Sequence, residues 1–429
     1  MNIAVSADNQ LPLSVALQNV PKSATLAINE KSKKLQQEGK DIIRLGLGQS
    51  PFPVPDIMVQ SLKTHASAKD YMAVQGYLPL REAIASFINQ TENLQRNAEH
   101  VIVGPGSKEL MFGLQMVLDC DLLLPSPSWV SYEPQAKLLG RKTHWLPCRA
   151  EDGWKLTADT LEQHCKTHRG KHQLLILNSP NNPSGACFNE QELKALAEIT
   201  EKYNVYVLSD EIYSALHYQG KHQSFARYYP QGTIISNGIS KWAGAGGWRL
   251  GFFIFPEQLK PILDLMVVLA SETYTSVSAP IQMASICAFE NTPETINYIH
   301  ACRKIMCSIG SNFSQLLNDQ HIKVVEPQGG FYNLADFSHY KEKLKANGIT
   351  SSEQLSNAIL ENSGVAALPG KDFGLPQDLI LRMAFVDFDS SELLQRVLNN
   401  PEIQLNAETA EFERLFSAPN RIGNWLNSL

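Results

Sequence analysis

The sequence predicts an α/β fold, with a large domain built on a mostly parallel mixed sheet flanked by helices and a smaller α+β domain. The first observation is a strand–helix–strand unit: the apolar run QLLILN at 173–178, a helix-sized segment at 191–203, and a run of β-forming residues within 204–213. This order is typical of parallel strands. The second observation is that strands and helices alternate from about 60 to 300.

The other segments follow in chain order. Residues 1–20 read as an irregular arm, Pro21 opens a helical segment that continues to about Gln37, and a proline-rich loop covers 50–55. A polar helical stretch at 294–318 leads to strands and loops of the smaller domain, at 321–337, 365–374 and 379–388. Beyond Asn400 the tail has amphipathic spacing (Phe412, Leu415, Phe416), which predicts packing on the surface or on a neighbouring subunit.

Polar residues follow the predicted strands of the large domain. Asn182 comes after the strand at 173–178, and Asp210 and Tyr213 come at the end of the next strand. Lys241 lies on a turn after a third strand, at 233–236. Because ligands of open α/β sheets bind beyond the carboxyl ends of the strands, we expect these four side chains to converge.

Lys241 stands in the stretch TIISNGISKWAGAGGWRLGF, at 233–252. An amine on a Gly-rich turn after a strand can be held in a site where burial lowers its pKa, and it can then condense with an aldehyde as a Schiff base. A lysine alone on a loop is more often only solvated, so the interpretation depends on the segments around it.

A phosphate site is predicted at 101–119, where a strand and a Gly-Pro-Gly turn precede a helix that starts near Ser107. Ser107 is expected to cap this helix, whose N-terminal N–H groups suit a phosphate. An ordinary helix cap without a ligand is the alternative.

Three motifs carry a family resemblance: NSPNNPSG, SDEIY, and SK followed by GWRLGF. In this order they resemble the signature of the class I and II pyridoxal-phosphate (PLP) aminotransferases, the fold-type-I group. The resemblance extends from about residue 44 to about residue 388.

The resemblance implies roles around the PLP ring. Lys241 would carry the cofactor as a Schiff base and then move the substrate proton as general base and acid. Asp210 would keep the pyridine nitrogen protonated. Tyr213 and Asn182 would donate hydrogen bonds to the phenolic oxygen, and Trp129 would stack on the ring.

Other residues are implied at the phosphate and at the substrate. The phosphate would be held by Ser107, Lys108, Ser240 and Arg249, and by Tyr71 of the neighbouring subunit in a homodimer with shared active sites. Gly238 stands where many members of the family carry a serine or threonine. Arg382 would bind the substrate α-carboxylate through its guanidinium fork, with Gly48 nearby.

Composition agrees with a globular enzyme. The 429 residues are long enough for two or three domains, with 43% hydrophobic and 19% charged residues and a net charge of −6. The sequence has no basic surface that would indicate a nucleic-acid partner. The seven cysteines form no CxxC pair and suit a reducing cytoplasm, and neither an apolar run long enough for a membrane nor a secretion signal is present.

We therefore expect a cytoplasmic PLP-dependent aminotransferase. It would act by a ping-pong mechanism on an L-amino acid, aspartate or a broad or aromatic range, and on a 2-oxo acid such as 2-oxoglutarate. The large domain is predicted at 60–300, and the small discontinuous domain at 1–59 and 301–429. The alternatives are another fold-type-I PLP enzyme, such as a C–S lyase or an eliminating or decarboxylating enzyme, and a non-catalytic regulator with this fold.

The donor stays open at the sequence level. In one subgroup of aspartate enzymes a lysine of the phosphate-loop segment binds the distal carboxylate. The matching position is Ser107, with Lys108 one residue further. Either the lysine has shifted, or the distal carboxylate is bound differently.

Overall fold

The computed structural model of the chain describes residue 17, residues 24–168 and residues 170–429. Most of the predicted arm at 1–20 and the predicted helix start at Pro21 lie outside these residues. The described part contains a seven-stranded sheet with strand order β2-β8-β7-β6-β5-β3-β4. The strands are β2 (Val101–Gly104), β3 (Asp121–Ser126), β4 (Thr143–Pro147), β5 (Gln173–Asn178), β6 (Tyr206–Asp210), β7 (Thr233–Gly238) and β8 (Gly251–Ile254).

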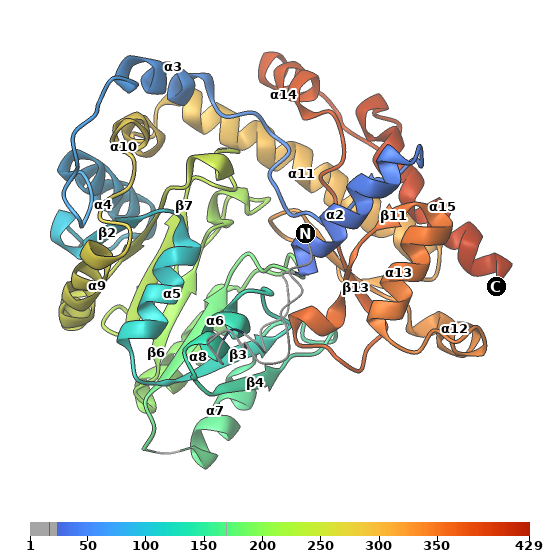
Figure 1. The fold of residues 1–429 in the computed structure, drawn as a ribbon, viewed down its shortest axis with the longest axis horizontal. Coiled ribbons are helices and arrows are strands. Elements are labelled where there is room, and N and C mark those ends of the chain that lie inside the picture. The colour runs from blue at the N-terminus through green and yellow to red at the C-terminus, as the bar shows by residue number, and fades with distance from the viewer. Residues whose placement is uncertain (1–16, 18–23, 169) are drawn as a thin grey trace, which may run out of the picture.

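The sheet is mostly parallel, as predicted. Strands β4, β3, β5, β6 and β7 pair in parallel, and β8 runs antiparallel to both of its neighbours. Register places Asn178 beside Asp210 and Asp210 beside Ser236. The residues that end β5, β6 and β7 therefore lie along one edge of the sheet (Figure 1).

Side chains that alternate along β5 fill two cores, one on each face of this sheet. Leu174 and Ile176 pack in one core, whereas Leu175 and Leu177 pack in the other. This period of two is the geometry of a strand buried on both faces. The covering helices are α5 (Ser107–Val117), α6 (Tyr132–Leu138) and α9 (Lys260–Glu272) with the first core, and α7 (Ala158–Thr167) and α8 (Glu190–Lys202) with the second.

A smaller sheet lies beside the large one in Figure 1. Its antiparallel strands have the order β12-β13-β10-β9, and a separate parallel pair joins β1 to β11. The strands are β1 (Ile43–Arg44), β9 (Lys323–Val324), β10 (Tyr332–Asp336), β11 (Val365–Ala366), β12 (Leu368–Pro369) and β13 (Ile380–Ala384). Four helices accompany them: α12 (Lys341–Ala346), α13 (Ser352–Ser363), α14 (Ser390–Asn399) and α15 (Glu413–Ser428).

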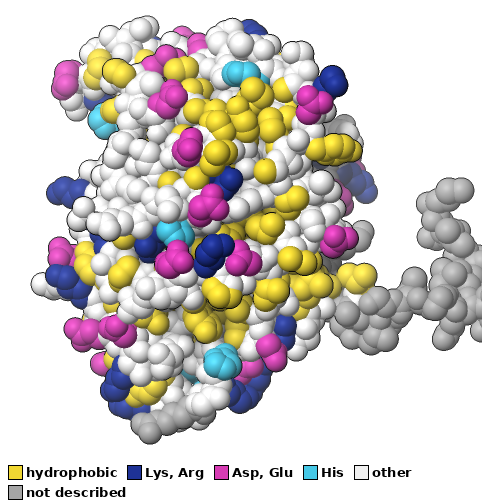
Figure 2. Space-filling view, turned by 90° about the vertical axis from the view of Figure 1, so that its left-hand side faces the viewer, with side chains coloured by type: hydrophobic (Ala, Val, Ile, Leu, Met, Phe, Trp, Pro, Cys, Tyr) yellow, Lys and Arg dark blue, Asp and Glu magenta, His cyan; other side chains and the backbone are white. Residues whose placement is uncertain are grey.

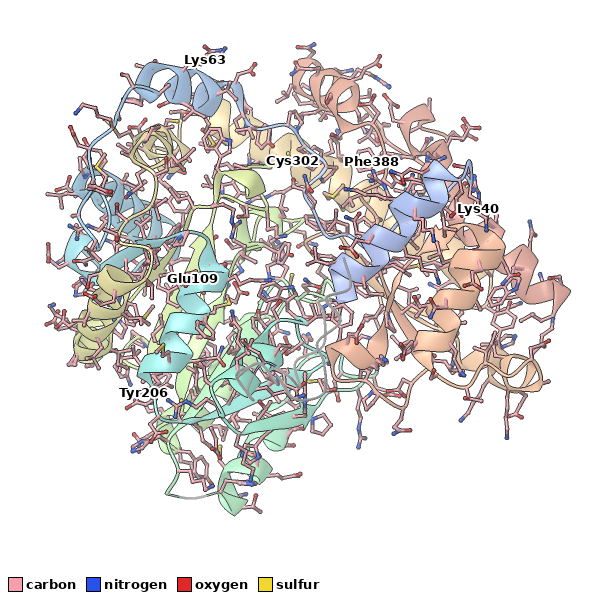
Figure 3. All side chains as sticks on the ribbon, viewed as in Figure 1. Lys40, Lys63, Glu109, Tyr206, Cys302 and Phe388 are labelled. Atoms are coloured by element: carbon pink, nitrogen blue, oxygen red, sulfur yellow. The ribbon has the colours of Figure 1, made fainter. Side chains whose placement is uncertain are left out.

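The long helix α11 (Pro293–Asp319) runs between the two parts of the molecule (Figure 1). Side chains fill the space around it, and the labelled Cys302 is fully buried there (Figure 3). The N-terminal half of the chain contributes α2 (Ala24–Gln37), α3 (Asp56–His65) and α4 (Leu78–Glu92), and α10 (Ala279–Ala284) packs against α3. Both sheets and their helices confirm the predicted fold class, whereas the division at 60 and 300 stays a prediction.

The C-terminal tail packs on its own chain. Leu415, Phe416, Ile422 and Leu426 of α15 are buried in the core that also contains residues of α11 and α13. The amphipathic spacing of the tail thus has a partner within the chain, which is one of the two predicted arrangements.

Candidate active site

A cavity of about 620 Å³ opens at the carboxyl edge of the large sheet. Its walls come from the ends of the strands, the start of α5 and the smaller sheet. Eleven of the twelve residues singled out in the sequence line it: Gly48, Ser107, Lys108, Trp129, Asn182, Asp210, Tyr213, Ser240, Lys241, Arg249 and Arg382. Tyr71 is the exception, since it is absent from the wall and its side chain is 90% exposed.

Lys241 follows β7 by three residues and points into this cavity. Its Nζ donates a hydrogen bond to the carbonyl of Gly48 at 2.9 Å. Burial lowers the pKa of Lys241 to about 8, and the positive charge of Arg382 acts in the same direction. The neutral, nucleophilic fraction of the amine at pH 7 is therefore roughly 300-fold larger than for an ordinary lysine.

Asp210 is the last residue of β6 and is 3% exposed. Its Oδ2 accepts a hydrogen bond from Tyr132 Oη at 2.6 Å, and its Oδ1 accepts a weaker one from Ser236 Oγ at 3.4 Å. Burial raises the pKa of Asp210 to about 6, and the Tyr132 hydrogen bond opposes this shift. No cation of the described residues forms an ion pair with Asp210, so a positively charged ligand atom would stabilise this carboxylate.

The turn after β5 is fixed by asparagine hydrogen bonds. Asn178 donates from Nδ2 to the carbonyl of Asp210 at 2.8 Å, and its Oδ1 accepts from the backbone N–H of Asn182 at 2.7 Å. Asn182 Oδ1 is buried without a hydrogen-bond partner among the described residues. A buried amide in this state indicates that a ligand completes its hydrogen bonds.

The start of α5 differs from the prediction in one detail. Gly106, with φ 94°, occupies the cap position, and Ser107 is the first helical residue, so the prediction that Ser107 caps this helix is wrong. A left-handed φ is easy only for glycine. Space demands glycine as well, because a Cβ on Gly106 would lie 2.1 Å from Arg249 Nη2. Arg249 also donates from Nη2 to the carbonyl of Pro105 at 3.1 Å, which holds its guanidinium against the loop.

Lys108 and Trp129 lie together on the cavity wall. The ammonium of Lys108 is 4.9 Å from the centroid of the Trp129 ring, a cation–π arrangement. Burial lowers the pKa of Lys108, with a smaller contribution from Arg249. Trp129 also meets Tyr132 edge to face, at 5.2 Å between centroids.

Arg382 is a buried cation without a carboxylate partner among the described residues. It lies on β13, is 3% exposed and donates from Nη2 to the carbonyl of Gly46. Its guanidinium stacks on Tyr332, 4.8 Å from the ring centroid, and its Nε has no hydrogen-bond partner. A buried charge without a counter-ion is costly, so this geometry suits an anionic ligand group.

Sequence reasoning missed two residues of the site. Tyr132 donates a hydrogen bond to Asp210, and the hydroxyl oxygen of Tyr332 lies 2.7 Å from the hydroxyl oxygen of Tyr213. Tyr132 comes three residues after Trp129 in the sequence. Tyr332 comes from the smaller sheet and carries no local signal.

Comparisons with known proteins agree with this site. The family model described as aminotransferase class I and II matches residues 40–397. An aspartate aminotransferase of Geobacillus stearothermophilus is 33% identical over 87% of this chain and 95% of its own.

Two solved structures are similar. The Thermus thermophilus aspartate aminotransferase with maleate has a TM-score of 0.81 at 28% identity, covering 91% of this chain and 98% of its own. An aromatic aminotransferase of Pyrococcus horikoshii has a TM-score of 0.77 at 26% identity, covering 92% of this chain and 99% of its own.

These similarities extend over both sheets and the cavity between them, and they make the protein a transaminase. The chain belongs to the class I and II aminotransferase family, whose members use pyridoxal phosphate. The eliminating and decarboxylating enzymes and the non-catalytic regulator are not favoured, since the relatives that match most of the chain are aminotransferases. Within the described residues, no helix is long and apolar enough to cross a membrane.

Proposed function

We propose that this transaminase binds PLP at Lys241 and moves amino groups from aspartate or an aromatic amino acid to 2-oxoglutarate. The observation that carries the proposal is the convergence of Lys241, Asp210 and Arg382 on one cavity. Lys241 is a buried amine with a lowered pKa. Among the described residues, the Asp210 carboxylate has no cation as an ion-pair partner and the Arg382 guanidinium has no carboxylate.

The residues present fit the cofactor. Asp210 would hold the pyridine nitrogen protonated, and the Asn182 amide Nδ2 and the Tyr213 hydroxyl would donate hydrogen bonds to the phenolic oxygen. Trp129 offers an aromatic face in the same cavity. The phosphate would be held by Ser107, Lys108, Ser240 and Arg249. When bound, PLP supplies an electron sink for the negative charge that develops at the substrate Cα.

Lys241 would then do the proton transfer. Once its amine is free, Lys241 would remove the proton from the substrate Cα as general base and return it, as general acid, to the cofactor carbon that the lysine had held. Burial keeps this amine partly neutral near pH 7, which suits a group that works in both directions. The amino group stays on the enzyme between the two half-reactions, so the first product leaves before the second substrate binds.

The proposed amino donors are based on the named relatives and on the position of Lys108. The relatives described above are named for aspartate and for aromatic amino acids. Lys108 lines the cavity, and none of the ion pairs among the described residues includes it. Its ammonium is therefore available either to the phosphate or to the distal carboxylate of aspartate.

A panel of amino donors with 2-oxoglutarate, scored by the keto-acid product, tests this proposal. We expect turnover with aspartate, phenylalanine or tyrosine. If Lys108 binds the distal carboxylate, Lys108→Met lowers kcat/KM for aspartate and leaves kcat/KM for phenylalanine unchanged. If Lys108 instead binds the cofactor phosphate, the same replacement lowers kcat/KM for both donors alike. An enzyme that turns over none of these donors would contradict the proposed substrates.

Replacement of Arg382 with lysine is expected to weaken binding of amino and keto acids alike, because the charge remains while the fork that binds a carboxylate bidentately is lost. We expect kcat/KM to fall about 10–100-fold for every donor and acceptor, the range of hydrogen bonds to charged groups. Steady-state kinetics measures this effect.

Arg81→Lys is the matched control. Arg81 is also buried, but it donates to the carbonyls of Gly76 and Ala98 and lies outside the cavity. Its replacement should change stability and leave KM unchanged. Unchanged kinetics in Arg382→Lys would contradict the assignment of Arg382 as the residue that binds the substrate α-carboxylate.

We also propose a homodimer that shares its active sites. Large hydrophobic side chains stay exposed on α4, α5 and α9, namely Leu78, Met116, Leu265 and Val268. Figure 2 shows hydrophobic side chains gathered on the face that carries these helices. Apolar patches of this kind are typical of interaction sites, and the exposed Tyr71 lies shortly before α4.

Mixing two inactive variants tests the shared site. If Tyr71 acts in the neighbouring subunit, mixed dimers of Tyr71→Ala and Lys241→Ala chains regain one intact site, because the Tyr71→Ala chain supplies the native Lys241 to it and the Lys241→Ala chain supplies the native Tyr71. Activity after mixing is the measurement. Mixed dimers that form but stay inactive would assign Tyr71 to its own chain or to packing alone.

A cytoplasmic location is part of the proposal. All seven cysteines are free, and four of them are buried. Free thiols persist in reducing compartments, which supports the assignment.

A further inference from the structure

A cluster of three histidines lies on the large sheet, apart from the cavity. His144 belongs to β4, the edge strand of the sheet, and His164 and His168 come from the end of α7. One nitrogen of each ring lies within 4.8 Å of those of the other two. None of the three lines the active-site cavity, and the mechanism proposed above does not use them.

We propose that His144, His164 and His168 bind one divalent transition-metal ion, with Zn²⁺ the best chemical match, and that this ion joins β4 to α7. Imidazole nitrogen is a preferred ligand of Zn²⁺, Cu²⁺ and Ni²⁺. Sites with three histidines leave a fourth position for water.

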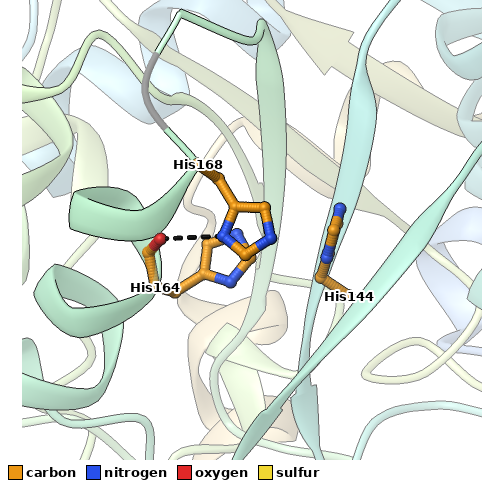
Figure 4. Close-up of side chains that lie close together, drawn as sticks. All are labelled: His144, His164 and His168. Atoms are coloured by element: carbon orange, nitrogen blue, oxygen red, sulfur yellow. Dashed lines mark hydrogen bonds between the residues drawn. The ribbon is translucent and has the colours of Figure 1, made fainter.

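The three rings pack against one another. His164 lies in α7 and His168 directly after its last residue, and the two rings stack nearly parallel with centroids 4.1 Å apart, so binding one ion requires at least one of them to rotate out of the stack. Their spacing of four residues places both side chains on one face at the end of the helix. His144 meets both rings edge to face, at 4.9 Å and 4.7 Å between centroids (Figure 4).

Hydrogen bonds leave lone pairs for the metal. His168 Nδ1 lies 3.0 Å from the carbonyl of His164, which only accepts, so Nδ1 carries the proton and Nε2 is left as a ligand (Figure 4). His144 Nε2 donates to Asp121 Oδ2 at 2.9 Å, which leaves Nδ1. His164 Nε2 lies 3.1 Å from the Gln173 amide nitrogen, and a half-turn of that amide would reverse the bond and leave Nδ1.

Asp121 adds the second layer of the site. Histidine ligands commonly donate their other ring N–H to a carboxylate, which fixes the ring and strengthens the ligand. The His144 and Asp121 side chains are only 11% and 18% exposed, so this pair is held in place. Lys171 also approaches Asp121, at 3.6 Å, but its side chain is 55% exposed and water screens its charge.

Rotation of the side chains closes the site. A tetrahedral Zn²⁺ holds each nitrogen at about 2.1 Å and so separates two of them by about 3.4 Å. One nitrogen of each ring lies within 4.8 Å of those of the other two, so these nitrogens must approach by at most roughly 1.4 Å as the rings turn toward the ion.

Calorimetric titration of the full-length, EDTA-treated protein with ZnCl₂ tests the site. We expect one ion per chain at this cluster. Replacing His144, His164 or His168 singly with glutamine should weaken binding by at least about tenfold, and Asp121→Asn by about 10–100-fold. His339→Gln is the matched control, because His339 and His321 form a separate pair of exposed rings, 4.8 Å apart.

A second measurement needs no variant. Zn²⁺ should protect His144, His164 and His168 of the native chain from diethyl pyrocarbonate, as mapped by mass spectrometry, and leave His321 and His339 reactive. Unchanged affinity in the three cluster variants, loss of binding in His339→Gln alone, or equal modification with and without Zn²⁺ would each overturn the proposal. In those cases the three rings only stack on one another.

Discussion

Replacement of Lys241 with alanine is expected to reduce kcat by at least about 10⁴-fold, at the upper end of what a general acid–base group contributes. Lys108 is the other lysine among the described residues that line the cavity, and its ammonium lies over the Trp129 ring rather than at the position of the Lys241 amine. The variant should still bind PLP, because the residues proposed for the ring and the phosphate remain. Initial rates at matched PLP content measure the loss.

Lys40→Ala is the control for this variant. Lys40 is exposed and lies outside the cavity, so its replacement should leave the rate unchanged. Transamination by Lys241→Ala near the native rate would contradict the proposed role of Lys241 in proton transfer.

Replacement of Asp210 with asparagine is expected to lower kcat by roughly 10²–10³-fold, the range for losing one stabilising charge in a transition state. An amide of the same size cannot hold a positive charge on the pyridine nitrogen. The loss should fall on proton transfer rather than on PLP content. A kinetic isotope effect measured with Cα-deuterated donor should therefore rise toward its limit.

Ser236→Ala is the control that distinguishes the effect of the Asp210 charge from the effect of a hydrogen bond to Asp210. It removes only the 3.4 Å hydrogen bond to Asp210, so its effect should be much smaller. A rate for Asp210→Asn close to the native rate, or a full loss of PLP without a change in the chemical step, would contradict the proposed role.

The motifs at the ends of the strands were predictable because parallel strands end at one edge. Asn182, Asp210 and Lys241 are far apart in the chain, yet β5, β6 and β7 are neighbours in register. The alternation of strands and helices from about 60 to 300 also predicted the mostly parallel sheet. The sequence motifs and the order of the strands therefore predict most of the residues that line the cavity.

Other features depend on contacts that no local pattern encodes. The left-handed φ of Gly106 displaces Ser107 from the cap position, and a Gly-Pro-Gly turn does not reveal which glycine adopts it. Tyr332 reaches Tyr213 from the smaller sheet, 119 residues away. The histidine cluster likewise arises only because β4 packs beside α7.

Borohydride reduction of the purified, PLP-loaded enzyme, followed by digestion and mass spectrometry of the peptides, tests the central claim most directly. Reduction fixes the cofactor on the amine that carries it. The site described here predicts a single phosphopyridoxyl group, on the peptide that contains Lys241, with loss of the visible absorbance and of activity in parallel. Label on any other lysine, or full activity after complete reduction, would contradict the assignment of Lys241 as the cofactor-binding residue.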